Sequence, residues 1–131
     1  MERPPALAAE KVREFVIAGH GNLERVQEML AEQPGLLNAA WDWGGGDFET
    51  ALAGAAHTGS REIARHLLAQ GAHMTLSAAA MLGELDLVKA ILAVQPEARH
   101  APGAHGIPLK VHAQQGGDAA AAVVAYLDGL D

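Results

Sequence analysis

Four segments of the chain superimpose on the pattern Ala-x-x-Gly, and this repetition constrains the fold more than any other feature. The four glycines are Gly21, Gly59, Gly83 and Gly116, and they stand at uneven intervals. An Ala-rich segment precedes each glycine and an apolar stripe follows it, which predicts a short helix on either side. Each glycine is then expected to take a left-handed turn conformation that other residues rarely adopt.

The stripes have the one-, three- and four-residue spacing that places side chains on one face of an α-helix. They are Val26, Met29 and Leu30; Ile63, Leu67 and Leu68; Leu87, Val88, Ile91 and Leu92; and, more loosely, Val123, Val124, Tyr126 and Leu127. One helix pair cannot enclose its own apolar face, so neighbouring pairs must stack on each other. The sequence therefore predicts an all-α chain of stacked helix pairs.

One segment carries a family resemblance. Thr50–Gly59 reads Thr-Ala-Leu-Ala-Gly-Ala-Ala-His-Thr-Gly and resembles the ankyrin repeat core, Thr-Pro-Leu-His-x-Ala-Ala-x-x-Gly; residues 107–113 resemble it more weakly. The resemblance implies an ankyrin-like helix-turn-helix solenoid with short β-hairpin fingers, in a single domain spanning 1–131. Its four degenerate repeats would cover about 7–37, 38–73, 74–104 and 105–128. The long first interval predicts an enlarged finger before Thr50, and the short second interval predicts that the next finger is almost absent.

Composition excludes several classes of function. Half of the residues are apolar and 19% are charged, which is typical of a folded chain. The nine Lys and Arg are scattered and outnumbered by sixteen Asp and Glu, so nucleic acid is not expected as a partner, and a partner surface with basic residues is favoured. The longest apolar run is too short to cross a membrane. With no cysteine, disulfides and Cys-ligated zinc are excluded, and a bacterial-type cytoplasmic protein is expected.

The resemblance also implies where partners would bind. In ankyrin-like units, the residues before each turn glycine and those at the finger tips face a concave groove. On this chain the groove residues are His20, His57, Thr58, Met81, Leu82 and Gln114, with Glu49 and His73 from the finger positions.

The enlarged finger is the second candidate binding feature. Three of the five aromatic residues, Trp41, Trp43 and Phe48, fall within eight residues around the run Gly44–Gly46, which is expected to form a hairpin tip. Large aromatic side chains on a loop are typical binding anchors, and Asp42 and Glu49 flank them. The alternative is that one tryptophan packs on the first helix pair and stabilises the finger.

The seven histidines raise the question of a metal site. His100, His105 and His112 lie in one stretch, but Pro102 and Gly103 prevent a helix from fixing their spacing, and zinc needs three or four convergent ligands. No metal site and no cofactor are predicted on this basis. His112 replaces a small alanine of the repeat, so it is interpreted as a buried, hydrogen-bonded filler.

Three functions remain. The first is a protein–protein interaction module that holds a partner of unknown identity between the concave groove and the finger. The second is a small-molecule-binding protein or cofactor-independent enzyme, in which His57 pairs with Glu49 or Asp42 for acid–base chemistry. Because no hydrolase, phosphate-loop or metalloprotease motif is present, we favour a non-enzyme. The third is a stable repeat protein without a specific ligand.

Overall fold

The computed structural model describes residues 2–131, and these are mostly helical, as predicted. The longer elements, in chain order, are α1 (Ala9–Ala18), α2 (Leu23–Glu32), β1 (Ala40–Asp42), β2 (Phe48–Thr50), α3 (Ala51–Thr58), α4 (Arg61–Ala69), α5 (Leu76–Leu82), α6 (Leu85–Val94), α7 (Leu109–Gln115) and α8 (Ala121–Gly129). Short 3-10 helices connect them: η1 (Pro34–Leu36), η2 (Pro96–His100), η3 (Ala104–Gly106) and η4 (Gly117–Ala120).

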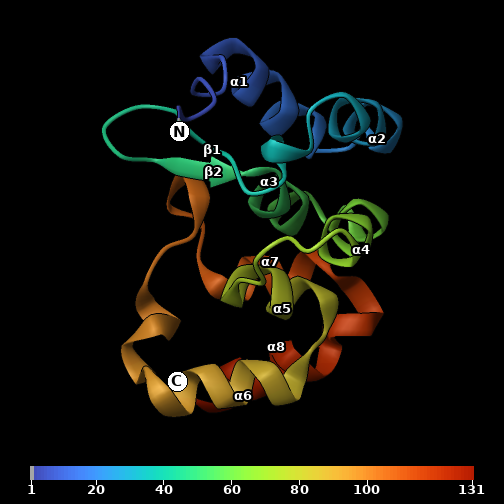
Figure 1. The fold of residues 1–131 in the computed structure, drawn as a ribbon. Helices are drawn as coiled ribbons and strands as arrows, with labels where there is room; N and C mark the ends of the chain where they lie inside the picture. Colours follow the sequence, from blue (N-terminus) through green and yellow to red (C-terminus); the bar gives the residue numbers. More distant parts are fainter. Residues whose placement is uncertain (1) are drawn as a thin grey trace.

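The helices follow one another through the molecule, from α1 and α2 at one end to α6 and α8 at the other (Figure 1). Helix α3 contacts α1 and α5, and α5 in turn contacts α7. Two apolar cores result, one from α1 to α5 and one from α5 to α8. Each predicted stripe contributes fully buried side chains, such as Val26, Leu67, Val88 and Val123, whereas Leu87 is 36% exposed because it lies on the outer side of α6.

The turn glycines follow the prediction at two positions. Gly59 and Gly83 end α3 and α5 in the left-handed conformation, with φ of 68° and 79°. At Gly21 and Gly116 the prediction is wrong, because neither glycine has a positive φ; at Gly116 φ is −74°, and Gly117 takes the positive φ instead. A Cβ on Gly116 would collide with the carbonyl oxygen of Met81, so this glycine is needed for the close approach of α7 to α5.

The enlarged finger forms the predicted hairpin. Strands β1 and β2 pair antiparallel with Trp41 opposite Glu49, and Gly44, Gly45 and Gly46 all take positive φ in the turn. β1 also contacts α1, so the finger is held against the first helix pair. By contrast, residues 70–75, between α4 and α5, contain no strand, as the short interval predicted.

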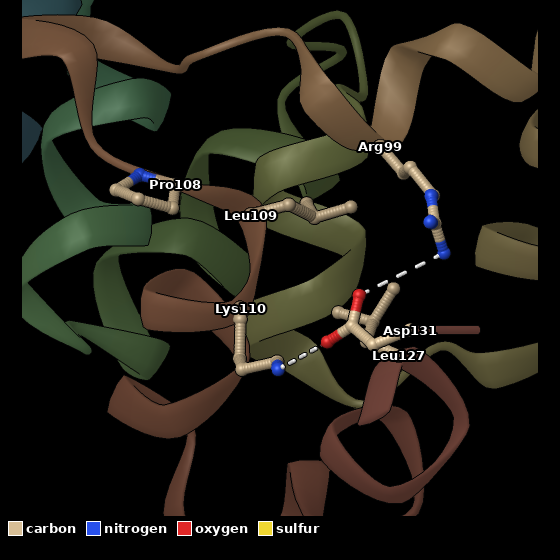
Figure 2. Close-up of a pocket in the computed structure, with 6 residues that line it drawn as sticks. All are labelled: Arg99, Pro108, Leu109, Lys110, Leu127 and Asp131. Atoms are coloured by element: carbon tan, nitrogen blue, oxygen red, sulfur yellow. Dashed lines mark hydrogen bonds and ion pairs between the residues drawn. The ribbon is translucent and has the colours of Figure 1, made fainter. Parts of the chain in front are cut away.

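At the other end of the molecule, a cavity of about 270 Å³ lies beside the chain terminus (Figure 2). Its charged groups already pair with one another: Lys110 Nζ lies 2.9 Å from Asp131 Oδ2, and Arg99 Nη1 lies 3.9 Å from Asp131 Oδ1. These ion pairs satisfy the charged groups that line the cavity, including Asp131. Among residues 2–131, no helix has the length and apolar character needed to span a membrane.

Candidate metal centre

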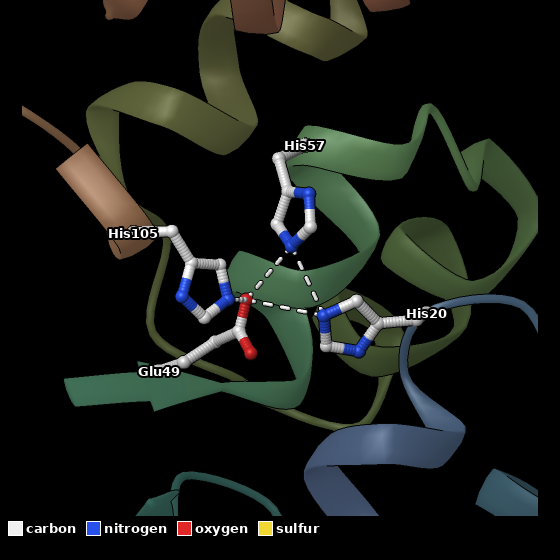
Figure 3. A group of neighbouring side chains, drawn as sticks. All are labelled: His20, Glu49, His57 and His105. Carbon is white, nitrogen blue, oxygen red and sulfur yellow. Dashed lines mark hydrogen bonds and ion pairs between the residues drawn. The ribbon is translucent and has the colours of Figure 1, made fainter. Parts of the chain in front are cut away.

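Four side chains from distant parts of the chain converge at one point: His20, Glu49, His57 and His105 (Figure 3). One potential ligand atom from each lies within 4.8 Å of all the others. Glu49 Oε2 is 2.9 Å from His57 Nε2 and 3.2 Å from the Nε2 atoms of both His20 and His105. The Nε2 atoms of His20 and His57 are 3.0 Å apart. Three imidazole nitrogens and one carboxylate oxygen thus share a single centre.

Close helix packing brings His20 and His57 together. His20 follows the end of α1, and His57 lies in the last turn of α3. A Cβ on Gly19 would lie only 2.6 Å from the Ala51 carbonyl oxygen, so glycine is needed where α1 meets α3. A Cβ on Gly54 would lie 2.6 Å from Cε1 of His20, so this glycine makes room for the imidazole ring over α3.

Glu49 forms the buried floor of the centre. It points inward from β2 and is 1% exposed, and Trp43 Nε1 donates a hydrogen bond of 2.8 Å to its Oε1. Burial alone would raise the pKa of Glu49, but hydrogen bonds from His20 and Trp43 and the charges of His20 and His105 outweigh it and lower the pKa to about 2. Glu49 is therefore a carboxylate at neutral pH, with Oε2 facing the histidines.

His105 reaches the centre from the connection between α6 and α7. Its φ is 59°, the only positive value at a non-glycine among the described residues. Asp47 holds this conformation: Oδ1 accepts from the His105 backbone N–H at 2.8 Å, and Oδ2 lies 2.8 Å from Nδ1. A strained backbone persists only where its surroundings fix it, and such residues concentrate at functional sites.

The hydrogen-bond network fixes which imidazole nitrogens face the centre as acceptors. His20 Nδ1 donates to the Val16 carbonyl oxygen at 2.8 Å, and His105 Nδ1 donates to the Asp47 carboxylate. In their neutral forms, both rings then present an Nε2 lone pair to Glu49 Oε2. Lone pairs and a carboxylate this close repel each other unless a cation lies between them. Either protons or a metal ion must balance the centre.

The pKa values of the two neighbouring histidines shift in opposite directions. The hydrogen bond to Glu49 is the main cause that raises the pKa of His20, whereas burial is the main cause that lowers the pKa of His57. The two rings are therefore unequal proton acceptors, and His57 in particular favours the neutral form, which is the form that binds metal ions.

A pocket of about 390 Å³ opens on the histidine side of the centre. The three histidines line it together with Ile17 and Trp43, while Glu49 lies behind them. Arg13 stacks on the outer part of Trp43, with its guanidinium carbon 5.7 Å from the ring centroid. The centre is thus buried on the carboxylate side and accessible on the histidine side.

The aromatic residues of the finger divide into two groups. Trp41 and Trp43 are partly buried and pack against the first apolar core, while Phe48 is 62% exposed. Asp42 does not meet His57, because its carboxylate accepts hydrogen bonds from Gly44 and Gly46 within the hairpin turn. The predicted pairing of His57 with Glu49 is present, whereas the alternative prediction, a pairing with Asp42, is wrong.

Several predicted groove residues lie apart from the centre. Thr58, His73 and Gln114 are exposed and do not join the cluster. Met81 and Leu82 are 0% and 2% exposed, so the prediction that they form an apolar groove surface is wrong: α5 is covered by α3 and α7, and its last turn is in the core. His112 is buried as predicted, but its Nδ1 bonds Pro108 in the same segment and not a neighbouring unit.

Sequence reasoning missed the convergence of His105 with His20 and Glu49. The available signal was the Asp47 carboxylate on the finger, but nothing in the sequence indicated that it would hold His105. Comparisons of the chain with protein-family models, curated proteins and solved structures found no match.

Proposed function

We propose that this protein binds a divalent transition-metal ion through His20, Glu49, His57 and His105. The observation that carries the proposal is the convergence of three imidazole Nε2 atoms on one carboxylate oxygen, with two of the rings fixed in the metal-binding tautomer. Ligating histidines typically donate their other N–H to a carboxylate or a backbone carbonyl. Asp47 and the Val16 carbonyl fill these two roles here.

The ligand set selects the class of ion. Imidazole nitrogen suits zinc, iron, copper and nickel, whereas magnesium and calcium prefer oxygen ligands. With three nitrogens and one oxygen, the centre favours Zn²⁺ or a neighbouring first-row ion. The negative charge of Glu49, which is buried, offsets part of the charge of the ion.

The adjoining pocket indicates that the ion would be accessible to a small molecule. Its volume of about 390 Å³ lies in the range of small-molecule sites, and its walls beyond the histidines, Ile17 and Trp43, are apolar. The four residues would fill a tetrahedral shell, so water or a substrate would enter from the open side as a fifth ligand. We therefore propose that the protein presents the ion to a small molecule, which would place it closer to a metal-dependent enzyme than to a purely structural zinc protein.

Cobalt substitution tests this proposal. We expect Co²⁺ to bind the metal-free protein one to one and to give visible d–d absorption typical of nitrogen and oxygen ligands, and azide to shift that spectrum by entering the open side. His57→Ala should abolish tight binding, while His66→Gln, in α4 and outside the cluster, should bind as the wild type does. Absence of saturable Co²⁺ and Zn²⁺ binding by the wild type would show that protons alone balance the centre. In that case, a cofactor-independent pair of His57 and Glu49 becomes the better explanation.

We further propose that the centre is built on an ankyrin-like array. Paired helices with left-handed Gly59 and Gly83 between them, and a β-hairpin before α3, support this interpretation. An experimental structure in which α3 and α5 do not stack side by side would contradict it.

A protein partner is the second candidate function, and the exposure of Phe48 on the finger favours it. Met81 and Leu82 cannot take part, so such a partner would contact the finger and the exposed Thr58 and Gln114. Once a partner is identified, Phe48→Ala should weaken its binding and leave Co²⁺ binding unchanged. Equal affinity of the variant and the wild type would remove the finger from that interface.

A further inference from the structure

The pocket on the open side of the candidate metal centre is apolar apart from the histidines themselves. Ile17 and Trp43 form its other walls, and Ile17 is 46% exposed. The indole N–H of Trp43 is already used by Glu49 Oε1, so this side chain offers the pocket only ring surface. A molecule that entered here would therefore meet one polar point, the ion, with an apolar wall beside it.

Arg13 stands at the far end of this wall. Arg13, Ile17 and His20 are spaced by four and three residues, so they share one face of α1 and of the turn that follows it. Arg13 thus lies on the pocket side of α1, one turn beyond Ile17. Seven residues of helix correspond to a rise of about 10 Å between Arg13 and His20.

The Arg13 guanidinium is held in place but is not neutralised. Its central carbon lies 5.7 Å from the Trp43 ring centroid, and the ring centroids of Trp43 and His105 are 6.0 Å apart. No more than these two distances together separates the guanidinium from the ring of a candidate ligand. Arg25 and Arg65 each pair with a glutamate, whereas Arg13 is exposed and has no hydrogen-bond or ion-pair partner within residues 2–131. Its donors are therefore free for an anionic group.

Both ends of the path from the centre to Arg13 would be positive once an ion is bound. A divalent ion with neutral imidazoles and the Glu49 carboxylate keeps an excess of one positive charge. The Asp47 carboxylate bonds Nδ1 of His105, the nitrogen that does not face the centre. An anionic head can therefore approach the ion as a fifth ligand, while a second anionic group pairs with Arg13.

We propose that this pocket takes a dianion with an apolar middle. One carboxylate ligates the ion, the hydrocarbon packs on Ile17 and Trp43, and a second anionic group pairs with Arg13. The inference rests on the proposed metal site and names the class of small molecule that would reach the ion. Arg13 would select a negative far end, although the net charge of −7 alone would favour a positive one.

Three acids with the same four methylene groups and different far ends test this proposal. Adipate ends in a carboxylate, hexanoate in a methyl group and 5-aminopentanoate in an ammonium group. Each is titrated into the Co²⁺-loaded protein, and the change in d–d absorption reports ligation. We expect the affinity to fall in that order, by roughly two- to five-fold at each step once the two equivalent heads of adipate are allowed for. The net charge alone would give the opposite order.

Variants of Arg13 assign the order to this side chain. Arg13→Lys should keep the order, Arg13→Gln should remove the preference for adipate, and Arg13→Glu should reverse the order. Arg65→Gln, in α4, makes the same change in net charge and should leave the order as in the wild type.

The inference is overturned if the wild type does not prefer adipate, or if Arg13→Gln keeps that preference. Co²⁺ binding is measured first, without any acid. If Co²⁺ binds and the acids show no such order, the inference fails and the metal site stands. If Co²⁺ does not bind, the proposed function and the inference fail together.

Discussion

The finger between α2 and α3 and the connection between α6 and α7 both deliver residues to the candidate metal centre, but they do so in different ways. The finger is a regular hairpin whose strand register places Glu49 opposite Trp41. The connection, residues 95–108, contains only short 3-10 turns, and His105 is held in a strained conformation by Asp47 of the finger. Strand pairing positions Glu49, whereas a contact with Asp47, which is distant in the sequence, positions His105.

This difference accounts for what the sequence could predict. The glycine run and the aromatic residues predicted the hairpin, and apolar spacing predicted the helices, because both are local signals. The pairing of His57 with Glu49 followed from the same local reasoning. The position of His105 did not, because Pro102 and Gly103 remove any periodicity and only a contact with Asp47, 58 positions away in the sequence, fixes it.

The burial of Met81 and Leu82 was missed for a related reason. The ankyrin resemblance places these positions on the concave surface, but here α3 and α7 pack against α5 and both side chains are buried. A pattern shared with a family predicts which elements form. It does not predict which side chains of those elements are exposed.

We expect the largest loss of Zn²⁺ affinity when the Glu49 carboxylate, the candidate ligand on the finger, is removed. Glu49→Gln removes the buried charge that faces the three histidines, so Zn²⁺ affinity measured by competition with a chromophoric chelator should fall by more than the roughly 10–100-fold typical for partners of ligating residues. Glu62→Gln, at an exposed position of α4, is the matched control. Wild-type affinity in Glu49→Gln would exclude this carboxylate as a ligand.

Removing the contact between Asp47 of the finger and His105 of the connection should lower Zn²⁺ affinity less. Asp47→Asn removes the charged acceptor that orients His105, and we expect Zn²⁺ affinity to fall by about 10–100-fold. Asp86→Asn, in the first turn of α6, controls for the loss of one negative charge. An unchanged affinity would mean that His105 is positioned without Asp47, and the contrast between the two regions would fail.

Within the finger, Trp43→Phe tests how much the hairpin itself orients Glu49. The variant keeps an aromatic ring but removes the N–H donor to Oε1, so Zn²⁺ affinity should fall by about 10-fold. Trp41→Phe is the matched control, because its indole N–H makes no hydrogen bond within residues 2–131. Equal losses in the two variants would assign the effect to packing and not to the hydrogen bond.

We expect the smallest effect from a pair of variants that tests the backbone strain at His105 through the stability of the fold. His105→Gly and His105→Ala both remove the imidazole, but only glycine adopts a φ of 59° without cost. In urea unfolding of the metal-free variants, His105→Ala should be less stable than His105→Gly by about 1 kcal/mol. Equal stabilities would show that the connection relaxes once the side chain is gone.

The four candidate ligands are contributed by segments as far apart as residues 20 and 105, and this has a consequence for the whole chain. An ion at the centre would close most of the polypeptide into one loop, in the manner of a covalent crosslink, and would be lost when the chain unfolds. Resistance to heat would then rise with the logarithm of the free zinc concentration above the dissociation constant. Supply of the ion in the cell would set how long the folded protein survives.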